Sequence, residues 1–308
     1  MRAFIFPGQG SQAVGMGAAL AGASRAAADV FAEVDEALGQ NLFRLMREGP
    51  DDELKLTENA QPAIMAHSIA VLRTLGVELG AVASFVAGHS LGEYSALRAA
   101  GSFDLATTAR LLKLRGQAMQ QAVPVGQGAM AALLGADLAL AQRIADAAAQ
   151  GEVCTVANDN DPSQVVISGH KGAIDRAIEL AKEMGAKRAV ALPVSAPFHC
   201  PLMEPAAEAM RDALGYIVLE APAVPLYANV TAQPETDPDT IRNQLVEQVT
   251  GMVRWRESIA NMAEAGVTEF GELGGKVLGA IIKRIAPDAK ATSVVTIEDV
   301  EALAKEIA

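Results

Sequence analysis

The chain has 308 residues, a length that predicts about two domains of ordinary size. Hydrophobic residues make up 51% of it and charged residues 20%, which is typical of a globular protein and excludes a disordered or fibrous chain. The formal net charge of −12 argues against binding to nucleic acid or to an anionic membrane over most of the surface.

The cysteines and the apolar runs indicate in which cellular compartment the protein is expected. Cys154 and Cys200 lack a C-x-x-C spacing, so neither a disulfide framework nor a cysteine zinc site is indicated. The first apolar run ends at Pro7, too soon for a signal peptide, and no later run approaches the ~20 residues of a membrane span. We therefore expect a cytoplasmic protein without a membrane partner.

Strands and helices alternate in the first part of the chain. Apolar spacing predicts a strand over 3–6, a helix over 16–38, a helix over 61–75, a buried strand over 82–87, a helix after Gly92 and a helix over 104–122. Pro62 is acceptable as the first residue of its helix. This alternation indicates an α/β fold with a parallel central sheet.

The segment from Pro124 to Pro193 has a different order. It predicts strand 129–134, helix 137–149, strands 153–157 and 164–168, helix 171–185 and strand 188–193, a βαββαβ series like that of ferredoxin-like domains. Residues 158–163 between the central strands are rich in turn formers. We predict an inserted domain over 124–195, a discontinuous large domain over 1–123 and 196–308, and a ligand crevice between them.

A nucleophile motif follows the strand predicted over 82–87. Residues Gly88 to Gly92 read G-H-S-L-G, the pattern of a nucleophile elbow when it stands between a strand and a helix. The glycines permit a sharp turn that exposes the Ser90 side chain. The amide of Leu91, at the helix N-terminus, can face the oxyanion formed on an attacked carbonyl. The alternative is a tight strand-to-helix turn without chemistry.

Acyl transfer through serine needs a base, and four histidines are available. His89 should point away from Ser90 and pack, because neighbouring side chains diverge. His67 lies among apolar residues of a predicted helix and reads as a core or boundary residue, and His170 as a solvated loop residue. His199 remains, in a proline-stiffened connection at the predicted domain junction, and is the candidate base.

Short motifs are spread over nearly the whole chain. They run from Pro7 to Gln12, Gln61 to Ala63, Gly88 to Tyr94, Arg115 to Gly116, Gly128 to Ala132, Gln164 to Gly169 and Ala196 to His199. In this order and spacing they resemble the malonyl-CoA:acyl carrier protein transacylases of bacterial fatty acid synthesis. The acyltransferase domains of polyketide synthases share them. The resemblance implies a hydrolase-like large domain with a ferredoxin-like insertion.

The resemblance also implies a role for each matching residue. Ser90 would carry the malonyl group, and His199 would act as general base and then acid. The amides of Gln9 and Leu91 would form the oxyanion hole, and glycines beside Gln9 let its backbone approach a ligand. Arg115 would bind the malonyl carboxylate, and Gln61 would line the same pocket. The main-chain carbonyl of Gln248 would orient His199.

Two of these side chains have alternative interpretations. An arginine on an alanine- and leucine-rich helix is usually solvated, but a dicarboxylic acyl group in a water-poor crevice needs a planar, always-charged partner such as Arg115. By analogy with acyltransferases, Phe198 would face the acyl α-carbon and favour malonyl over α-methylated groups. A core aromatic residue is the alternative.

The expected partners are malonyl-CoA and an acyl carrier protein, with malonyl-CoA a substrate and no cofactor or metal implied. Both partners are anionic. Basic residues that could meet them are Lys187, Arg188, Arg254, Arg256, Lys276, Lys283 and Arg284. The family-based expectation is a monomer. A serine esterase or thioesterase, a non-catalytic carrier-binding module, and an acyltransferase for a polyketide or malonate-decarboxylase carrier remain alternatives.

Overall fold

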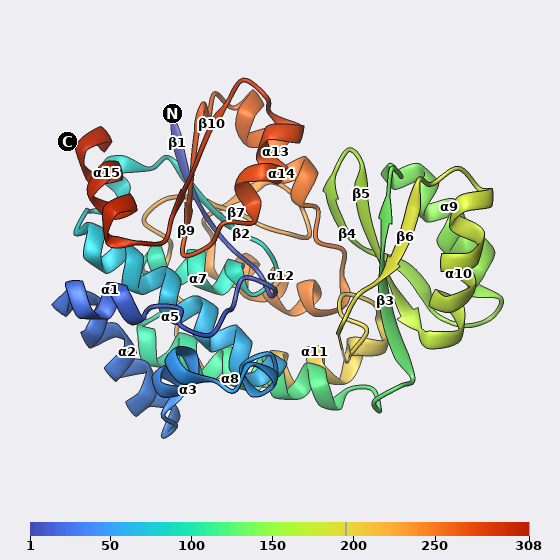
Figure 1. Cartoon of the computed structure of the whole chain (residues 1–308), viewed down its shortest axis with the longest axis horizontal. Coiled ribbons are helices and arrows are strands. Elements are labelled where there is room, and N and C mark those ends of the chain that lie inside the picture. Colours follow the sequence, from blue (N-terminus) through green and yellow to red (C-terminus); the bar gives the residue numbers. More distant parts are fainter. Residues whose placement is uncertain (195, 308) are drawn as a thin grey trace.

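The computed structural model describes residues 1–194 and 196–307, which form two β-sheets side by side with helices around them (Figure 1). The predicted end of the inserted domain at residue 195 and the chain end at 308 lie outside the described residues. The predicted domain boundaries therefore stay predictions. The α/β class is confirmed.

The strands are β1 (Arg2–Phe6), β2 (Phe85–Gly88), β3 (Gly128–Leu134), β4 (Cys154–Asp161), β5 (Gln164–His170), β6 (Arg188–Ala191), β7 (Leu226–Tyr227), β8 (Pro234–Glu235), β9 (Glu269–Leu273) and β10 (Lys290–Val294). The helices of the first half are α1 (Ala18–Ala23), α2 (Arg25–Leu38), α3 (Leu42–Glu48), α4 (Asp51–Leu54), α5 (Thr57–Leu75), α6 (Leu79–Val82), α7 (Gly92–Ala99), α8 (Leu105–Gln121) and α9 (Leu138–Ala149). Those of the second half are α10 (Lys171–Glu183), the 3-10 turn Pro201–Met203, α11 (Glu204–Gly215), α12 (Pro238–Thr250), α13 (Trp255–Glu264), α14 (Leu278–Ile285) and α15 (Ile297–Ile307).

The larger sheet has six strands in the order β10-β9-β1-β2-β7-β8. Its pairs are parallel from β10 to β7, and β8 pairs antiparallel with β7 at one edge. The predicted parallel sheet is therefore a mixed sheet. Its two central strands are β1 and β2, so the carboxyl end of β1 opens beside that of β2, where the Ser90 turn begins.

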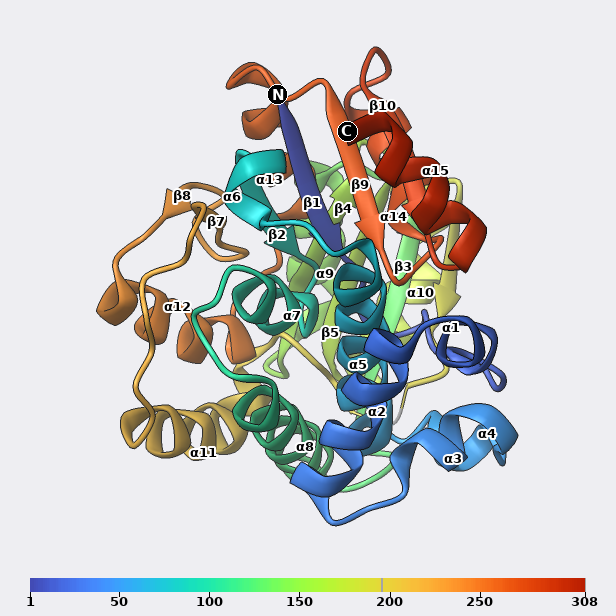
Figure 2. The same ribbon diagram turned by 90° about the vertical axis from the view of Figure 1, so that its left-hand side faces the viewer.

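Helices cover both faces of the larger sheet (Figure 2). Phe4 and Phe6 of β1 pack into the core formed with α2, α5, α7 and α8, whereas Ala3 and Ile5 face the core formed with α13 and α14. The alternation follows from the two-residue period of a strand and gives β1 a continuous apolar sequence. Within the described residues, no helix combines the length and apolar character needed to span a bilayer.

The smaller sheet has four antiparallel strands in the order β4-β5-β3-β6. Its elements follow one another along the chain as β3, α9, β4, β5, α10 and β6, the series predicted for this segment. Helices α9 and α10 lie on its outer face, away from the larger sheet (Figure 1), and enclose a core of their own.

Two predicted helices begin or end elsewhere. The helix predicted over 16–38 is two helices, because Ser24 has an extended backbone and its side chain accepts a hydrogen bond from the Ala27 amide as the N-cap of α2. The helix predicted from Gln61 begins at Thr57, so Pro62 lies inside it. Proline in the second turn removes one backbone hydrogen bond, which the buried packing of α5 outweighs.

The strand predicted over 82–87 is β2, displaced to Phe85–Gly88 because residues Leu79–Val82 form the short helix α6. The predicted turn over 158–163 is wrong for most of its length, since β4 continues to Asp161. The carboxylates of Asp159 and Asp161 are buried and bind Arg256 and Arg284 at 2.7 Å. Asp161 also accepts a local turn bond from the Ser163 amide at 2.8 Å, so the ion pairs add to the turn bonding that this composition suggests.

Those ion pairs join β4 of the smaller sheet to α13 and α14 beside the larger one. Backbone bonds from the Asp159 amide to the Val253 carbonyl and from the Val253 amide to the Ala157 carbonyl complete the connection. The two sheets are thus fastened to each other at one end of β4.

Replacing Arg284 by alanine would leave the Asp161 carboxylate, which is fully buried, without its cation. The arginine is itself 47% exposed, so we expect the free energy of unfolding to fall by about 1–3 kcal/mol. Urea unfolding measures this change. Lys171→Ala removes an exposed pair with Asp175 and serves as the control, with at most about 0.5 kcal/mol lost. Equal losses of unfolding free energy in the two variants would show that the buried Asp161 pair stabilises the fold no more than an exposed pair does.

Candidate active site

Ser90 lies in a sharp turn between β2 and α7, with a φ of 54°. A Cβ atom on Gly88 would lie 1.9 Å from the Gly92 carbonyl carbon, and one on Gly92 would lie 2.4 Å from the Phe6 carbonyl oxygen. Glycine is therefore required at both ends of the turn. The serine takes up the left-handed backbone that projects its side chain away from the sheet.

The Ser90 hydroxyl contacts one histidine. Its Oγ lies 2.7 Å from His199 Nε2, and His199 Nδ1 lies 2.8 Å from the main-chain carbonyl oxygen of Gln248. A carbonyl only accepts, so Nδ1 carries the proton and Nε2 presents its lone pair to the serine hydroxyl. This geometry is that of a serine nucleophile with an imidazole base.

His199 is held neutral. It is 3% exposed, and burial together with the nearby Arg115 guanidinium lowers its pKa to about 3. The imidazole therefore binds no proton at neutral pH and can accept one from Ser90. Its backbone φ of 55° is in the left-handed region, a strained conformation that a histidine adopts where the surroundings fix it.

A cavity of about 400 Å³ opens over these two side chains. Ser90, Leu91, His199 and other residues beside the larger sheet line one side of it. The segment of the smaller sheet supplies the opposite wall, with Met130, Asn158, Leu192, Pro193 and Val194. The cavity thus lies between the two sheets, where the sequence predicts a ligand crevice.

The Arg115 side chain enters this cavity from α8 and is 1% exposed. Three neutral oxygens accept its hydrogen bonds: Gln61 Oε1 at 2.9 Å, Gln248 Oε1 at 2.8 Å and Ser90 Oγ at 3.2 Å. Its Nε has no partner among the described residues. Burial lowers the pKa of Arg115, and an anion in the cavity would offset that cost.

The other predicted residues also line the cavity. Phe198 is 8% exposed beside His199, and Gln61 reaches it from α5. Gln9 and Leu91 lie at the two backbone segments that meet at the elbow, where a Cβ on Gly8 would come within 2.9 Å of the His89 carbonyl oxygen. Leu91 precedes the first residue of α7, so its amide belongs to a helix N-terminus.

The sequence and the fold agree with one family of enzymes. Residues 3–274 match the family model described as acyl transferase domain. The chain belongs to that family. It is 47% identical to the malonyl CoA-acyl carrier protein transacylase of Escherichia coli K12 over 92% of each chain, and 45% identical to that of Bacillus subtilis over 97% of this chain and 95% of the relative.

Solved structures of similar proteins have the same fold. An acyl-carrier-protein S-malonyltransferase from Bartonella henselae is 52% identical, with a TM-score of 0.97 over 99% of both chains. A malonyl-transacylase in complex with a type II polyketide synthase acyl carrier protein is 41% identical, with a TM-score of 0.96 over 99% of both chains. Because these identities are high, the similarity indicates membership of the same acyltransferase family and not only a shared fold.

The remaining histidines of this acyltransferase have other surroundings. His67 is 3% exposed in α5, as predicted. His89 is buried, its Nε2 lies 2.8 Å from Asn160 Oδ1, and its ring packs edge-on against Trp255, which fits the predicted packing role. His170 is not a solvated loop residue: it ends β5, is half-buried, and its Nδ1 accepts a hydrogen bond from the Val153 amide at 2.9 Å.

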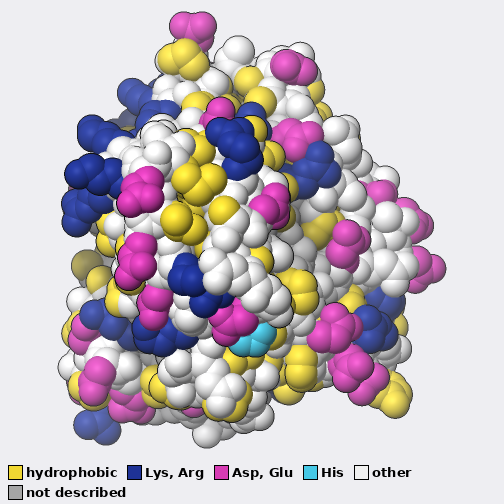
Figure 3. Space-filling view, turned by 90° about the vertical axis from the view of Figure 1, so that its right-hand side faces the viewer, with side chains coloured by type: hydrophobic (Ala, Val, Ile, Leu, Met, Phe, Trp, Pro, Cys, Tyr) yellow, Lys and Arg dark blue, Asp and Glu magenta, His cyan; other side chains and the backbone are white. Residues whose placement is uncertain are grey.

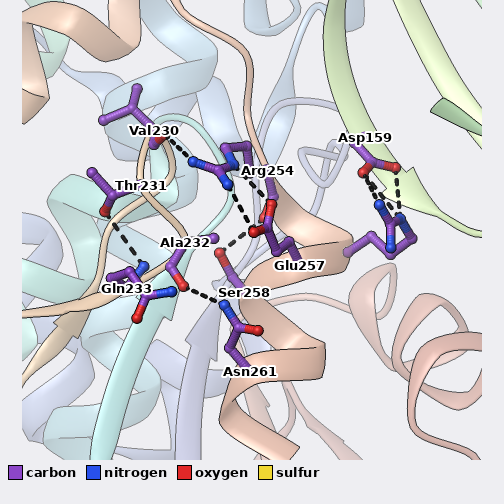
Figure 4. A network of polar contacts seen from close by, with 10 residues as sticks. Asp159, Val230, Thr231, Ala232, Gln233, Arg254, Glu257, Ser258 and Asn261 are labelled. Atoms are coloured by element: carbon purple, nitrogen blue, oxygen red, sulfur yellow. Dashed lines mark hydrogen bonds and ion pairs between the residues drawn. The ribbon is translucent and has the colours of Figure 1, made fainter. Parts of the chain in front are cut away.

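Asn229 is a site residue that sequence reasoning missed. Its Nδ2 donates to the Gly88 carbonyl at 2.7 Å, and its Oδ1 accepts from the Ser90 amide at 2.8 Å, so one side chain holds the elbow on both sides of His89. It follows the very short β7, and no motif marks an asparagine there. Its loop is braced by α13 (Figure 4): Asn261 Nδ2 donates to the Ala232 carbonyl.

Arg254 braces the same loop by donating from Nη1 to the Val230 carbonyl at 3.1 Å, and it also binds Glu257 (Figure 4). No group of three or more His, Cys, Asp or Glu side chains in the described part of the chain could hold a metal ion. Cys154 and Cys200 are both buried and free.

Replacing Asn229 by alanine would leave the buried Gly88 carbonyl and Ser90 amide without these partners. We expect each to cost about 1–3 kcal/mol of unfolding free energy. Acyl transfer should fall by roughly 100-fold, because a displaced elbow misplaces the nucleophile. Urea unfolding and a steady-state transfer assay measure the two effects. Gln142→Ala removes an exposed contact with Asp146 and is the control; full activity of Asn229→Ala would rule out the elbow role.

Proposed function

We propose that this chain transfers the malonyl group of malonyl-CoA to the phosphopantetheine thiol of an acyl carrier protein, as its relatives' names describe, through a malonyl ester of Ser90. The observation that carries the proposal is the contact of the Ser90 hydroxyl with both the His199 imidazole and the buried Arg115 guanidinium. A nucleophile beside a cation whose direct hydrogen-bond partners are all neutral suits an acyl group with a free carboxylate.

In the first half-reaction, His199 Nε2 accepts the hydroxyl proton while Ser90 Oγ attacks the thioester carbonyl of malonyl-CoA. The amides of Gln9 and Leu91 stabilise the oxyanion that forms. The carbon–sulfur bond then breaks, and the imidazolium returns its proton to the sulfur of the leaving coenzyme A. The Gln248 carbonyl holds the ring in the required tautomer throughout.

The second half-reaction reverses these roles. His199 takes the proton of the carrier thiol, whose sulfur attacks the malonyl ester carbonyl. Collapse of the second oxyanion breaks the bond to Ser90 Oγ, which regains its proton from the imidazolium. The enzyme returns to its starting state with the malonyl group on the carrier protein.

A neutral carbonyl, not a carboxylate, orients the base. A carbonyl stabilises an imidazolium less than a carboxylate does, so His199 is a modest base. Thioester exchange tolerates that, because a thiolate is a good leaving group. Phe198, on the wall beside His199, is proposed to face the acyl α-carbon and disfavour α-methylated groups.

Charged residues on the surface could contribute to binding of the carrier protein. Arg254, Arg256 and Arg284, three of the basic residues proposed to meet anionic partners, are paired with Glu257, Asp159 and Asp161. Basic side chains nevertheless gather at the upper left edge of the face in Figure 3, while acidic ones are spread over the rest of it. A local basic region within an acidic protein supports recognition of an acidic carrier.

We also propose the domain organisation, the cellular location and the oligomeric state of the chain. A hydrolase-like domain over 1–123 and 196–308 with a ferredoxin-like insertion over 124–195 is supported by the mixed and antiparallel sheets and by the strand order β4-β5-β3-β6. A cytoplasmic monomer that needs no cofactor and binds no nucleic acid fits the family and the net charge of −12. The polyketide carrier in the complex of one relative makes such a carrier a second candidate acceptor.

Intact-mass measurement after incubation with malonyl-CoA tests the reaction. The wild type should gain one malonyl group, which fatty acid or polyketide carrier protein then removes as malonyl-carrier, and Ser90→Ala should gain none. Rapid release of free malonate without a carrier would indicate a thioesterase. An unchanged mass of the wild type would exclude a covalent mechanism.

Arg115→Ala tests the carboxylate clamp. Removing one partner of a buried ion pair costs roughly 3–5 kcal/mol, so malonyl transfer should lose a factor of about 10² to 10³ or more in kcat/KM. Acetyl transfer should fall less, because acetyl has no carboxylate to pair. Arg115→Lys keeps a charge but lacks the planar fork and is the matched variant. If alanine slows malonyl and acetyl transfer equally, Arg115 does not bind the carboxylate.

A further inference from the structure

Glu93 is a buried carboxylate for which the transfer steps have no use. It lies in the first turn of α7, three residues after Ser90, and is 1% exposed. Its Oε2 accepts a hydrogen bond from Gln248 Nε2, and its Oε1 accepts one from the Asn229 amide at 3.4 Å. A buried carboxylate costs free energy unless it is paired with a positive charge or neutralised by a proton.

One side-chain amide links Glu93 to the clamp arginine. Gln248 donates from Nε2 to Glu93 and accepts at Oε1 from Arg115 Nη2 at 2.8 Å. A carboxylate only accepts and a guanidinium only donates, so the two ends fix the orientation of the Gln248 amide. The negative and positive charges therefore face each other across a single amide group in a buried region, where screening by water is weak.

The charges around Glu93 leave Arg115 as its cation. Burial is the largest influence and raises the Glu93 pKa to about 7, against the lowering effects of the hydrogen bonds from Gln248 on α12 and the Asn229 backbone and of the Arg115 charge on α8. Tyr94 on the same helix has a raised pKa and stays neutral. His89 and His199 have lowered pKa values and supply no positive charge at neutral pH.

A malonyl carboxylate in the cavity would change this balance. Two carboxylates would then share one guanidinium, and like charges in one buried site favour protonation of one of them. The substrate carboxylate would contact the guanidinium directly, whereas Glu93 reaches it only through Gln248, so Glu93 is the one to be neutralised. A proton from solvent would bind Glu93 as malonyl enters and return to solvent as malonyl leaves on the carrier.

We propose that Glu93 is the counter-ion of Arg115 in the empty enzyme and takes up one proton when a malonyl carboxylate occupies the cavity, so that binding of a carboxylated acyl group is linked to pH. The inference rests on the proposed function. Glu93 acts through Gln248 and Arg115 and is a positioning residue, not a catalytic one.

The linkage has a definite sign. Above the Glu93 pKa the ionised carboxylate competes with malonyl for Arg115, so kcat/KM for malonyl-CoA falls as pH rises, by up to about tenfold per pH unit for one linked proton. Acetyl-CoA carries no acyl carboxylate, so its kcat/KM should lack this decline. The preference for malonyl over acetyl should therefore be highest below about pH 7 and decrease above it.

Glu93→Gln is the decisive variant, because its side-chain oxygen can still accept from Gln248 while the charge is removed. We expect the decline of malonyl kcat/KM with pH to disappear, leaving the variant above the wild type by roughly tenfold one pH unit above the Glu93 pKa. Acetyl-CoA is the matched control substrate. The same slope in the wild type and Glu93→Gln would overturn the proposal.

Calorimetry gives a second measurement that does not depend on that variant folding. Ser90→Ala binds malonyl-CoA without transfer, and titration in two buffers of different ionisation enthalpy reports protons taken up. We expect uptake with malonyl-CoA, beyond that with acetyl-CoA, which has the same coenzyme phosphates. Equal uptake for both ligands would overturn the linkage. Failure of the proposed function would look different: the wild type would form no malonyl-carrier protein at any pH.

Discussion

The site is organised around a buried positive charge. The Arg115 guanidinium is 1% exposed and meets only neutral acceptors directly, and so the elements around it must supply oxygen atoms at fixed positions. Helix α5 supplies Gln61, α12 supplies Gln248 and the elbow supplies Ser90. A buried guanidinium charge costs free energy, and an acyl carboxylate bound among these oxygens would offset that cost.

Gln248 links that charge to the base. Its backbone carbonyl fixes the tautomer of His199, while its side chain bonds with Arg115, Glu93 and the Ser90 carbonyl. A shift of α12 would therefore disturb the Ser90, His199 and Arg115 side chains together. Mutations in this helix should be read as changes to several groups at once, since residues in one hydrogen-bond network are not energetically independent.

Motifs with their own chemistry could be read from the sequence, and residues whose partners are distant could not. The glycine spacing around Ser90 and the proline-rich context of His199 are local signals, and both residues lie where the motifs predict. Glu93 stood within a recognised motif, but its role depends on Arg115 and Gln248 from other helices. Asn229 has no local signature. Asp159 and Asp161 suggested a turn because their arginine partners are about a hundred residues away.

The division of the cavity walls has a mechanistic consequence. Ser90, His199, Arg115 and Gln248 are tied to one another by direct hydrogen bonds, whereas Met130 and residues 192–194 only cover the opposite side. The smaller sheet is fastened near Val253 and by the aspartate–arginine pairs of β4, close to the wall residue Asn158. Met130 and residues 192–194, among the described residues, make no hydrogen bond to Ser90, His199, Arg115 or Gln248. We therefore expect this part of the wall to adjust to two different thioesters, coenzyme A and a carrier-bound arm, without altering the 2.7 Å contact between nucleophile and base.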